Sequence, residues 1–194
     1  YTITHNGAIA GSRISLLDCY VSPPLPVVNP VSNVQPCGTE TVPAIAFTGT
    51  AGATFNWTNN NTSIGLAASG TGNIPSFTAI NTGTTNQVAT ITVTPVANGC
   101  SGTSQTFTIT VNPTPTVSIL ADYCAVAGKV RLTANSSVSG VTWAWNTNPA
   151  QTTQTIDVDI AGTYTVTATA GSGCVGTASI SIAEELVIFG CLKN

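Results

Sequence analysis

The sequence predicts an all-β protein built from two tandem antiparallel β-sandwiches, with additional strand segments at both ends. Three observations predict this fold. Short segments alternate apolar residues with Thr or Ser, clusters of Gly, Asn, Ser and Pro separate them, and a Gly-Cys-x-Gly-Thr motif occurs twice. Alternation with period two is typical of half-buried strands, and many short strands with frequent turns are typical of sandwiches. No segment has the pattern of an amphipathic helix.

The clearest strand signals lie in four segments that are rich in Thr, Val and Ile. Turn-forming residues at 97–99 and 170–173 interrupt them, which predicts antiparallel hairpins. One face of each strand is apolar, so we expect each strand to contribute one face to a core. The segments are 87–93 (QVATITV), 105–111 (QTFTITV), 162–168 (GTYTVTA) and 177–182 (TASISI).

The repeated motif, at 99–103 and 173–177, indicates two copies of one fold. Each motif lies in a predicted hairpin, and each is preceded by a Trp within a strand segment, Trp57 in the first copy and Trp145 in the second. The first Trp follows Cys37 by 20 residues, and the second follows Cys124 by 21. The first copy also carries an extra stretch rich in Asn, Gly, Ser and Thr.

We therefore divide the chain into two predicted sandwiches, 31–114 and 115–183, with a short segment at each end. Residues 1–30 read as a hairpin followed by a Pro-rich linker, and residues 184–194 read as a strand segment. Prolines precede both sandwiches. Because proline fixes φ and lacks an N–H, these linkers are expected to be semi-rigid.

The two ends resemble parts of the repeat. Residues 1–4 (YTIT) are similar to 164–167 (YTVT), and 13–16 (RISL) are similar to 179–182 (SISI). Residues 1–17 therefore look like the last hairpin of another copy. The stretch 186–191 looks like a strand that reaches a Cys. An isolated hairpin is only marginally stable in water, so we expect both ends to need partners.

Composition excludes several classes of function. Only 6% of the residues are charged and the net charge is −3, whereas a typical domain has about 25% charged residues. This is too little positive charge for a nucleic-acid footprint. No apolar run approaches the roughly 18 residues of a membrane helix, so no membrane insertion is expected. A surface made soluble by Thr, Ser and Asn offers little self-repulsion and permits close association with copies of itself.

No catalytic or cofactor-binding motif is recognisable. His5 is the single His, and no nucleophile or carboxylate is spaced to use it as a base. Asp157 and Asp159 share a strand face and read as a solvated face, with a calcium site as the alternative. There is no CxxC pair or Cys/His cluster for zinc. We expect a protein that is not an enzyme and has no metal or cofactor.

Several stretches resemble the PKD-like and immunoglobulin-like repeats of very large secreted surface proteins of Bacteroidetes bacteria. In the first copy these are 55–66 (FNWTNNNTSIGL), 98–100 (NGC) and 106–115 (TFTITVNPTP), close to the PKD-like repeat. In the second copy, Trp145 with 152–156 and 161–166 is similar to the Ig-like repeats. The resemblance covers about 31–183. It implies Ig/PKD-like sandwiches, secretion to the bacterial cell surface, and a role as spacer or adhesive module.

In sandwiches of this kind a strand Trp usually lies in the core. We therefore expect Trp57, Trp145 and Tyr164 to be core residues. Trp143 shares a strand face with Trp145 and is left as a candidate for stacking on a ligand, such as a surface glycan. Exposed, coplanar aromatics would favour carbohydrate binding, and buried ones would count against it.

Six cysteines in a Lys-poor chain indicate disulfides and an oxidising compartment. Pairs Cys37–Cys100 and Cys124–Cys174 would each join the first strand of a sandwich to its last hairpin and contribute about 3–4 kcal/mol. Cys19 and Cys191 would then lie near opposite ends of the molecule. An intramolecular bridge would have to cross about 70 Å, so a bridge between chains is easier. The sequence alone does not fix the pairing.

These observations favour an extracellular filament subunit or surface adhesin segment. In this hypothesis copies associate head to tail through strand exchange and disulfides, because head-to-tail contacts do not close. Its partners are copies of itself or neighbouring repeats of one array, with surface glycans as further candidates. Two alternatives stay open: the chain is a window of a longer repeat array, or it is a carbohydrate-binding or spacer module of a secreted multidomain hydrolase.

Overall fold

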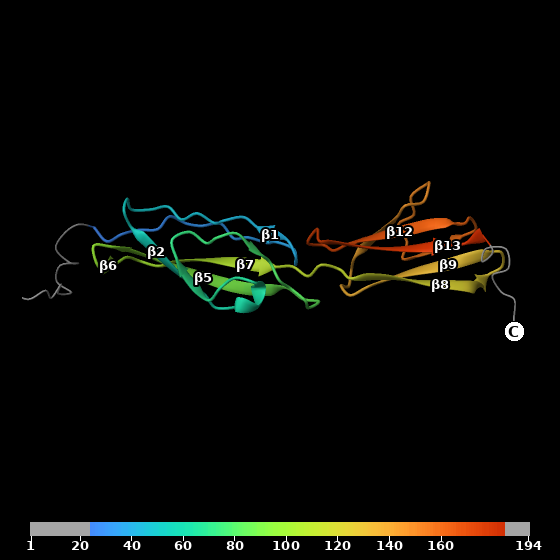
Figure 1. Ribbon diagram of the computed structural model, residues 1–194, viewed down its shortest axis with the longest axis horizontal. Helices are drawn as coiled ribbons and strands as arrows, with labels where there is room; N and C mark the ends of the chain where they lie inside the picture. The colour runs from blue at the N-terminus through green and yellow to red at the C-terminus, as the bar shows by residue number, and fades with distance from the viewer. Residues whose placement is uncertain (1–23, 185–194) are drawn as a thin grey trace, which may run out of the picture.

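The computed structural model describes residues 24–184, and these form an all-β protein with two β-sandwiches placed end to end (Figure 1). The predicted fold class is therefore confirmed. The expectations for residues 1–23 and 185–194, including those on His5, Cys19 and Cys191, lie outside the described residues. The strands run close to the long axis of the rod, and the first and last described residues lie at opposite ends of it.

The first sandwich contains β1 to β7 and one 3-10 helix, η1. Its larger sheet has the order β3-β2-β5-β6, with β7 paired to β5. Opposite it lie β1, paired with β4, and two bridges, Val28 with Gly49 and Ile45 with Ile74. The elements are β1 Thr41–Val42, β2 Thr54–Asn59, η1 Thr62–Ile64, β3 Ser69–Thr71, β4 Phe77–Thr78, β5 Gln87–Ala97, β6 Cys100–Ser101 and β7 Gln105–Val111.

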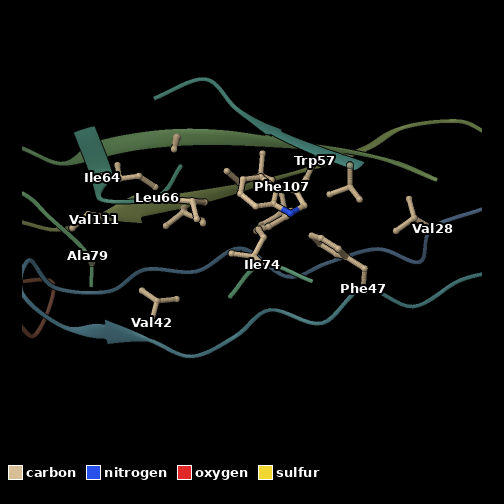
Figure 2. Close-up of a cluster of buried hydrophobic side chains, with 14 residues drawn as sticks. Val28, Val42, Phe47, Trp57, Ile64, Leu66, Ile74, Ala79, Phe107 and Val111 are labelled. Atoms are coloured by element: carbon tan, nitrogen blue, oxygen red, sulfur yellow. The ribbon is translucent and has the colours of Figure 1, made fainter. Parts of the chain in front are cut away.

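The first core fills the space between these two layers (Figure 2). Alternating residues of β5 and β7 point into it because strand side chains alternate between faces. Trp57 lies at its centre beside Phe107 and Ile74. The extra stretch of the first copy supplies Ile64, which is fully buried. The core residues are Val28, Val42, Phe47, Trp57, Ile64, Leu66, Ile74, Ala79, Ala89, Ile91, Val93, Phe107, Ile109 and Val111.

The second sandwich consists of two three-stranded sheets, β10-β12-β13 and β11-β9-β8. Its core contains Trp145 and the inward residues of β9, β11 and β12. The full set is Val130, Leu132, Ala134, Trp145, Ile156, Val158, Val166 and Ile182. The strands are β8 Val117–Val126, β9 Lys129–Ser136, β10 Thr142–Trp145, β11 Thr155–Val158, β12 Gly162–Thr169 and β13 Val175–Ile182.

The two core tryptophans differ in how their indole N–H is satisfied, and this difference predicts different costs of substitution. Trp145 Nε1 donates to the carbonyl oxygen of Thr153 at 2.9 Å, whereas Trp57 Nε1 is buried with no hydrogen-bond partner among the described residues. Both Trp→Phe changes lose ring volume, but only Trp145→Phe leaves a carbonyl without its donor. We expect Trp145→Phe to lower the free energy of unfolding by about 0.5–1.5 kcal/mol more than Trp57→Phe, the net value of one hydrogen bond to a carbonyl that water can partly solvate. Urea titration of each variant measures this, and equal losses would contradict it.

Candidate functional site

The junction between the two sandwiches is closed by a disulfide between Cys37 and Cys174. Cys37 lies at the end of the first sandwich that faces the second, bridged in parallel to Asn112 just after β7. Cys174 belongs to the hairpin between β12 and β13 and is 1% exposed. The bond therefore joins two domains that the chain also connects through residues 112–116.

This pairing corrects the expectation of Cys37–Cys100 and Cys124–Cys174. Cys37 and Cys100 lie at opposite ends of the first sandwich, because the β5–β6 hairpin that carries Cys100 points away from the junction (Figure 1). Cys100 and Cys124 are themselves disulfide-bonded. The proposed bridge of Cys19 and Cys191 to a neighbouring chain involves residues outside the described range.

Hydrogen bonds hold the junction in addition to the disulfide. The N–H of Gly38 donates to the carbonyl oxygen of Asn112 at 2.9 Å, and the hydroxyl of Thr114 donates to the carbonyl oxygen of Gly38 at 2.8 Å. The Cys37 N–H donates to Glu40 Oε2 at 2.8 Å. The linker is thus fixed to the first sandwich before it enters the second.

The segment of chain that enters each sandwich lies directly against the second glycine of the repeated motif in that sandwich. A Cβ on Gly176 would lie 1.9 Å from the carbonyl oxygen of Pro115, and one on Gly102 would lie 1.6 Å from that of Pro26. Any side chain would collide with this backbone, so only glycine permits the approach. The repeated motif therefore has a structural role. In both sandwiches its second glycine leaves room for the carbonyl group of a proline in the segment that enters the sandwich.

At one edge of the second sandwich, which we call the seam, β8 and β13 lie against each other. β8 and β13 are the edge strands of their two sheets, and no backbone hydrogen bond joins them in the described part of the chain. Their inward side chains pack on the core but are only partly buried. These are Val117, Ile119, Ala121 and Tyr123 on β8 and Ala178 and Ile180 on β13.

The aromatic residues singled out in the sequence lie at different depths. Trp57 and Trp145 are 4% and 2% exposed. Tyr164 is half-buried against the second core, and its hydroxyl donates to the carbonyl oxygen of Ile160 at 2.6 Å. Burial raises the pKa of Tyr164. Trp143 is half-buried beside the same core.

Trp143 also lines a cavity of about 300 Å³ near the junction end of the second sandwich. The rest of its wall is largely polar and is formed by the last residue of β9, the loop that follows it, and the residue before β11. Aromatic and hydroxyl-bearing walls of this kind suit a small polar ligand. The other lining residues are Ser136, Val138, Ser139, Gly140, Val141 and Gln154.

Asp157 of β11 and Asp159, the residue just after this strand, each pair with a cation of β9. Arg131 Nε and Nη2 donate to the two carboxylate oxygens of Asp157 at 2.8 and 3.0 Å, and Lys129 Nζ lies 3.6 Å from Asp159. The hydrogen bond from Arg131 lowers the pKa of Asp157, and Asp157 in turn raises the pKa of Arg131. Residues 24–184 contain no group of three or more His, Cys, Asp or Glu side chains that could hold a metal ion.

This ion pair predicts a small, pH-dependent contribution to stability. Because the pKa of Asp157 is lowered in the folded state, the stabilisation is present above the ordinary pKa of 3.8 and is lost as pH falls toward the lowered value. We expect Asp157→Asn to reduce the free energy of unfolding at pH 7, and the difference from the parent to shrink at a second, acid pH below 3.8. Urea titrations at both pH values measure this. Asp159→Asn serves as the control, and an equal deficit at both pH values would contradict the assignment.

Residues 40–115 match the family model of the PKD-like domain. A search of curated proteins found no match. Similar solved structures include DIP-gamma IG1+IG2 (11% identity, TM-score 0.40, 81% of this chain and 96% of that chain). They also include the N-terminal eight Ig domains of Down Syndrome Cell Adhesion Molecule isoform 1.30.30 (11%, 0.34, 82% and 23%) and the human Desmocollin-1 ectodomain (9%, 0.32, 83% and 37%). The first sandwich is thus similar to a PKD-like domain.

Within residues 24–184, no helix is both long enough and apolar enough to cross a membrane.

Proposed function

We propose that the chain is an extracellular, non-catalytic structural module of a bacterial surface, a stiff two-domain rod whose copies associate head to tail into a filament or adhesive array. The observation that carries this proposal is the covalent junction. A disulfide between the domains, added to the linker, makes the pair one mechanical unit. Persistent disulfides require an oxidising compartment, which supports export from the cell.

The arrangement suits transmission of force along the rod. Strands of both sandwiches lie near the long axis (Figure 1), so tension between the ends loads their hydrogen-bond ladders in shear. At the junction the load is shared between residues 112–116 and the Cys37–Cys174 bond. With only 6% charged residues, lateral faces of neighbouring rods repel one another weakly.

Assembly is tested with the full chain, oxidised and at neutral pH. We expect light scattering after size-exclusion chromatography to show species larger than the 19.6 kDa chain as concentration rises, and negative-stain electron microscopy to show thin unbranched fibres. Non-reducing gels of boiled, thiol-blocked samples then separate covalent from non-covalent contacts. A monomer at every concentration would contradict the filament and leave a spacer module.

A second candidate function, carbohydrate binding, is favoured by the cavity at Trp143. An indole face beside hydroxyl and amide groups is the usual arrangement for stacking on a sugar ring. We expect a glycan array probed with the full chain to give signals that Trp143→Ala removes and Trp143→Phe largely retains. Signals unchanged in Trp143→Ala would exclude this site.

A further inference from the structure

We propose that the side of the second sandwich opposite the seam carries two subsites for an uncharged oligosaccharide, with Trp143 in one and Tyr164 in the other. This inference rests on the candidate carbohydrate-binding function and deepens it, because it adds a second subsite and names the class of ligand. Three features of the molecule carry it: two cavities on the same side, an aromatic ring in the wall of each, and walls without unpaired charge.

The sheet orders place both cavities between two edge strands. β8 and β13 are the edge strands at the seam, so β10 and β11, at the other ends of the two sheets, lie at the opposite side. The loop 146–154 connects these two strands there, and its Gln151 carbonyl oxygen accepts a hydrogen bond from the backbone N–H of Trp145 at 2.9 Å. One cavity is lined by β10 and the residue before β11, and the other by β11, by Tyr164 of β12 and by the same loop.

The first subsite is the cavity of about 300 Å³ at Trp143. Its wall also contains Ser136, Ser139 and Gln154. Gln154 Nε2 donates to the carbonyl oxygen of Ala134 at 2.9 Å, and the amide oxygen has no donor among the described residues. This cavity therefore combines an aromatic ring with groups that donate and accept hydrogen bonds, as the ring and the hydroxyl groups of a sugar require.

The second subsite is a cavity of about 260 Å³ at the end of β11 that lies away from the junction. Its wall contains Tyr164, whose hydroxyl donates to the carbonyl oxygen of Ile160 at 2.6 Å. This bond fixes the ring beside Ile160, which is 71% exposed. Asp157 and Asp159 also line the cavity. An aromatic ring, an exposed aliphatic side chain and carboxylates thus lie together, and carboxylates accept hydrogen bonds from hydroxyl groups.

The charges of both walls favour a ligand without charge. None of the described residues that line the first cavity is charged. In the second cavity, Arg131 Nε and Nη2 donate to the two oxygens of Asp157 at 2.8 and 3.0 Å, and Lys129 Nζ lies 3.6 Å from Asp159. Lys129 and Arg131 are the two cationic side chains of residues 24–184, so an acidic glycan would meet two carboxylates and no unpaired cation. A paired carboxylate keeps lone pairs for hydroxyl donors.

The size and spacing of the cavities favour an oligosaccharide over a single sugar. Both cavities lie at or below the lower end of the range of about 300–1,000 Å³ that holds drug-sized ligands, so each suits one sugar ring. Trp143 is paired with Ala168, and Tyr164 lies four residues from Ala168 on β12, which is about 13 Å along the strand. A chain of sugars that lies along the strands can therefore occupy both cavities, and linking two weak contacts raises the affinity.

The test is calorimetric titration of the oxidised full chain with linear, β-1,4-linked oligomers of glucose, mannose and N-acetylglucosamine, from the single sugar to the hexamer. Oligogalacturonates serve as acidic probes. We expect at least one uncharged series to bind, with an affinity that rises about tenfold or more between the single sugar and the oligomers that span both cavities. Trp143→Ala and Tyr164→Ala should each reduce the affinity of the hexamer to that of the short oligomers, because each removes one of the two linked contacts.

Tyr123→Ala is the matched control, since Tyr123 is half-buried against the same core but lies on β8 at the seam. This variant should lose stability and bind every oligomer as the parent does. Near-UV circular dichroism identifies the variants that stay folded. Gln151→Ala, which changes the wall of the second cavity outside the core, replaces Tyr164→Ala if that variant unfolds.

The outcomes separate the subsites from the candidate function. If uncharged oligomers bind and Trp143→Ala weakens them, but folded variants of the second cavity do not, the second subsite is overturned and carbohydrate binding stands. An affinity that is the same at every oligomer length leads to the same conclusion. Tighter binding of oligogalacturonates than of every uncharged series overturns the class of ligand. Absence of binding to all of these probes overturns both the subsites and the candidate function.

Discussion

Replacing Cys37 and Cys174 together by serine is expected to turn the rod into two hinged domains and to lower its stability. The bond closes a sequence separation of 137 residues. Loop-closure entropy for that separation is about 5 kcal/mol, and losses on removing native disulfides are typically 2–5 kcal/mol. Part of this loss should fall on the junction, because each sandwich keeps its own core.

Two measurements separate the hinge from the stability loss. Small-angle scattering should show a shorter and broader distribution of distances in the double variant, since the linker alone no longer sets the angle between the domains. We expect thermal unfolding to be a single coupled transition in the parent and to split into two transitions in the double variant. Val175→Ser, at an exposed position beside Cys174, is the control. An unchanged scattering curve would mean that the hydrogen bonds around Gly38 and Thr114 suffice to hold the junction.

The alternating segments were enough to predict the fold class. Residues 105–111 coincide with β7, and residues 87–93, 162–168 and 177–182 fall within β5, β12 and β13. In these segments burial on one face imposes period two on the sequence. The shortest strands, β1, β4 and β6, contain two residues each, which is too few to show any period, and no alternation signals them.

The disulfide pairing is not predictable from the repeat. Both copies place a Cys about 20 residues before a Trp and another in the last hairpin, which fits bonds within copies and bonds between copies equally. The choice depends on which end of each sandwich faces the other, and that is a property of domain orientation. One sequence feature does relate to domain orientation, the second glycine of each motif. It contacts a preceding proline, and this contact lies at the same end of both sandwiches.

The seam is likewise a tertiary property. In sequence β13 alternates as regularly as β7 does, and nothing distinguishes a strand with a neighbour on each side from an edge strand. What the sequence does contain is an unassigned hairpin-like segment at residues 1–17. Its alternation predicts a strand, and that prediction lies outside the residues that the structure describes.

Alanine at Gly176 is expected to disrupt the junction more than alanine at any other described glycine of the second sandwich. Its Cβ would lie 1.9 Å from the carbonyl oxygen of Pro115 and 3.1 Å from Val117 Cγ2. The obstacle is backbone, so relief requires the linker or the hairpin to move. Cys174, two residues away, opposes that movement through its bond to Cys37. We expect a loss of about 1–3 kcal/mol or more, at the upper end for overpacking.

The same hairpin offers a matched control at Gly171, where an added Cβ meets nothing within 4 Å. Gly171→Ala should leave stability unchanged or raise it by about 0.4–1 kcal/mol, because alanine restricts the unfolded chain. Gly102→Ala should repeat the loss in the first sandwich, where the Cβ would lie 1.6 Å from the Pro26 oxygen. Urea titrations of the three variants compare them directly. Equal stability of Gly176→Ala and Gly171→Ala would show that the linker yields freely, and the rod could not then be stiff.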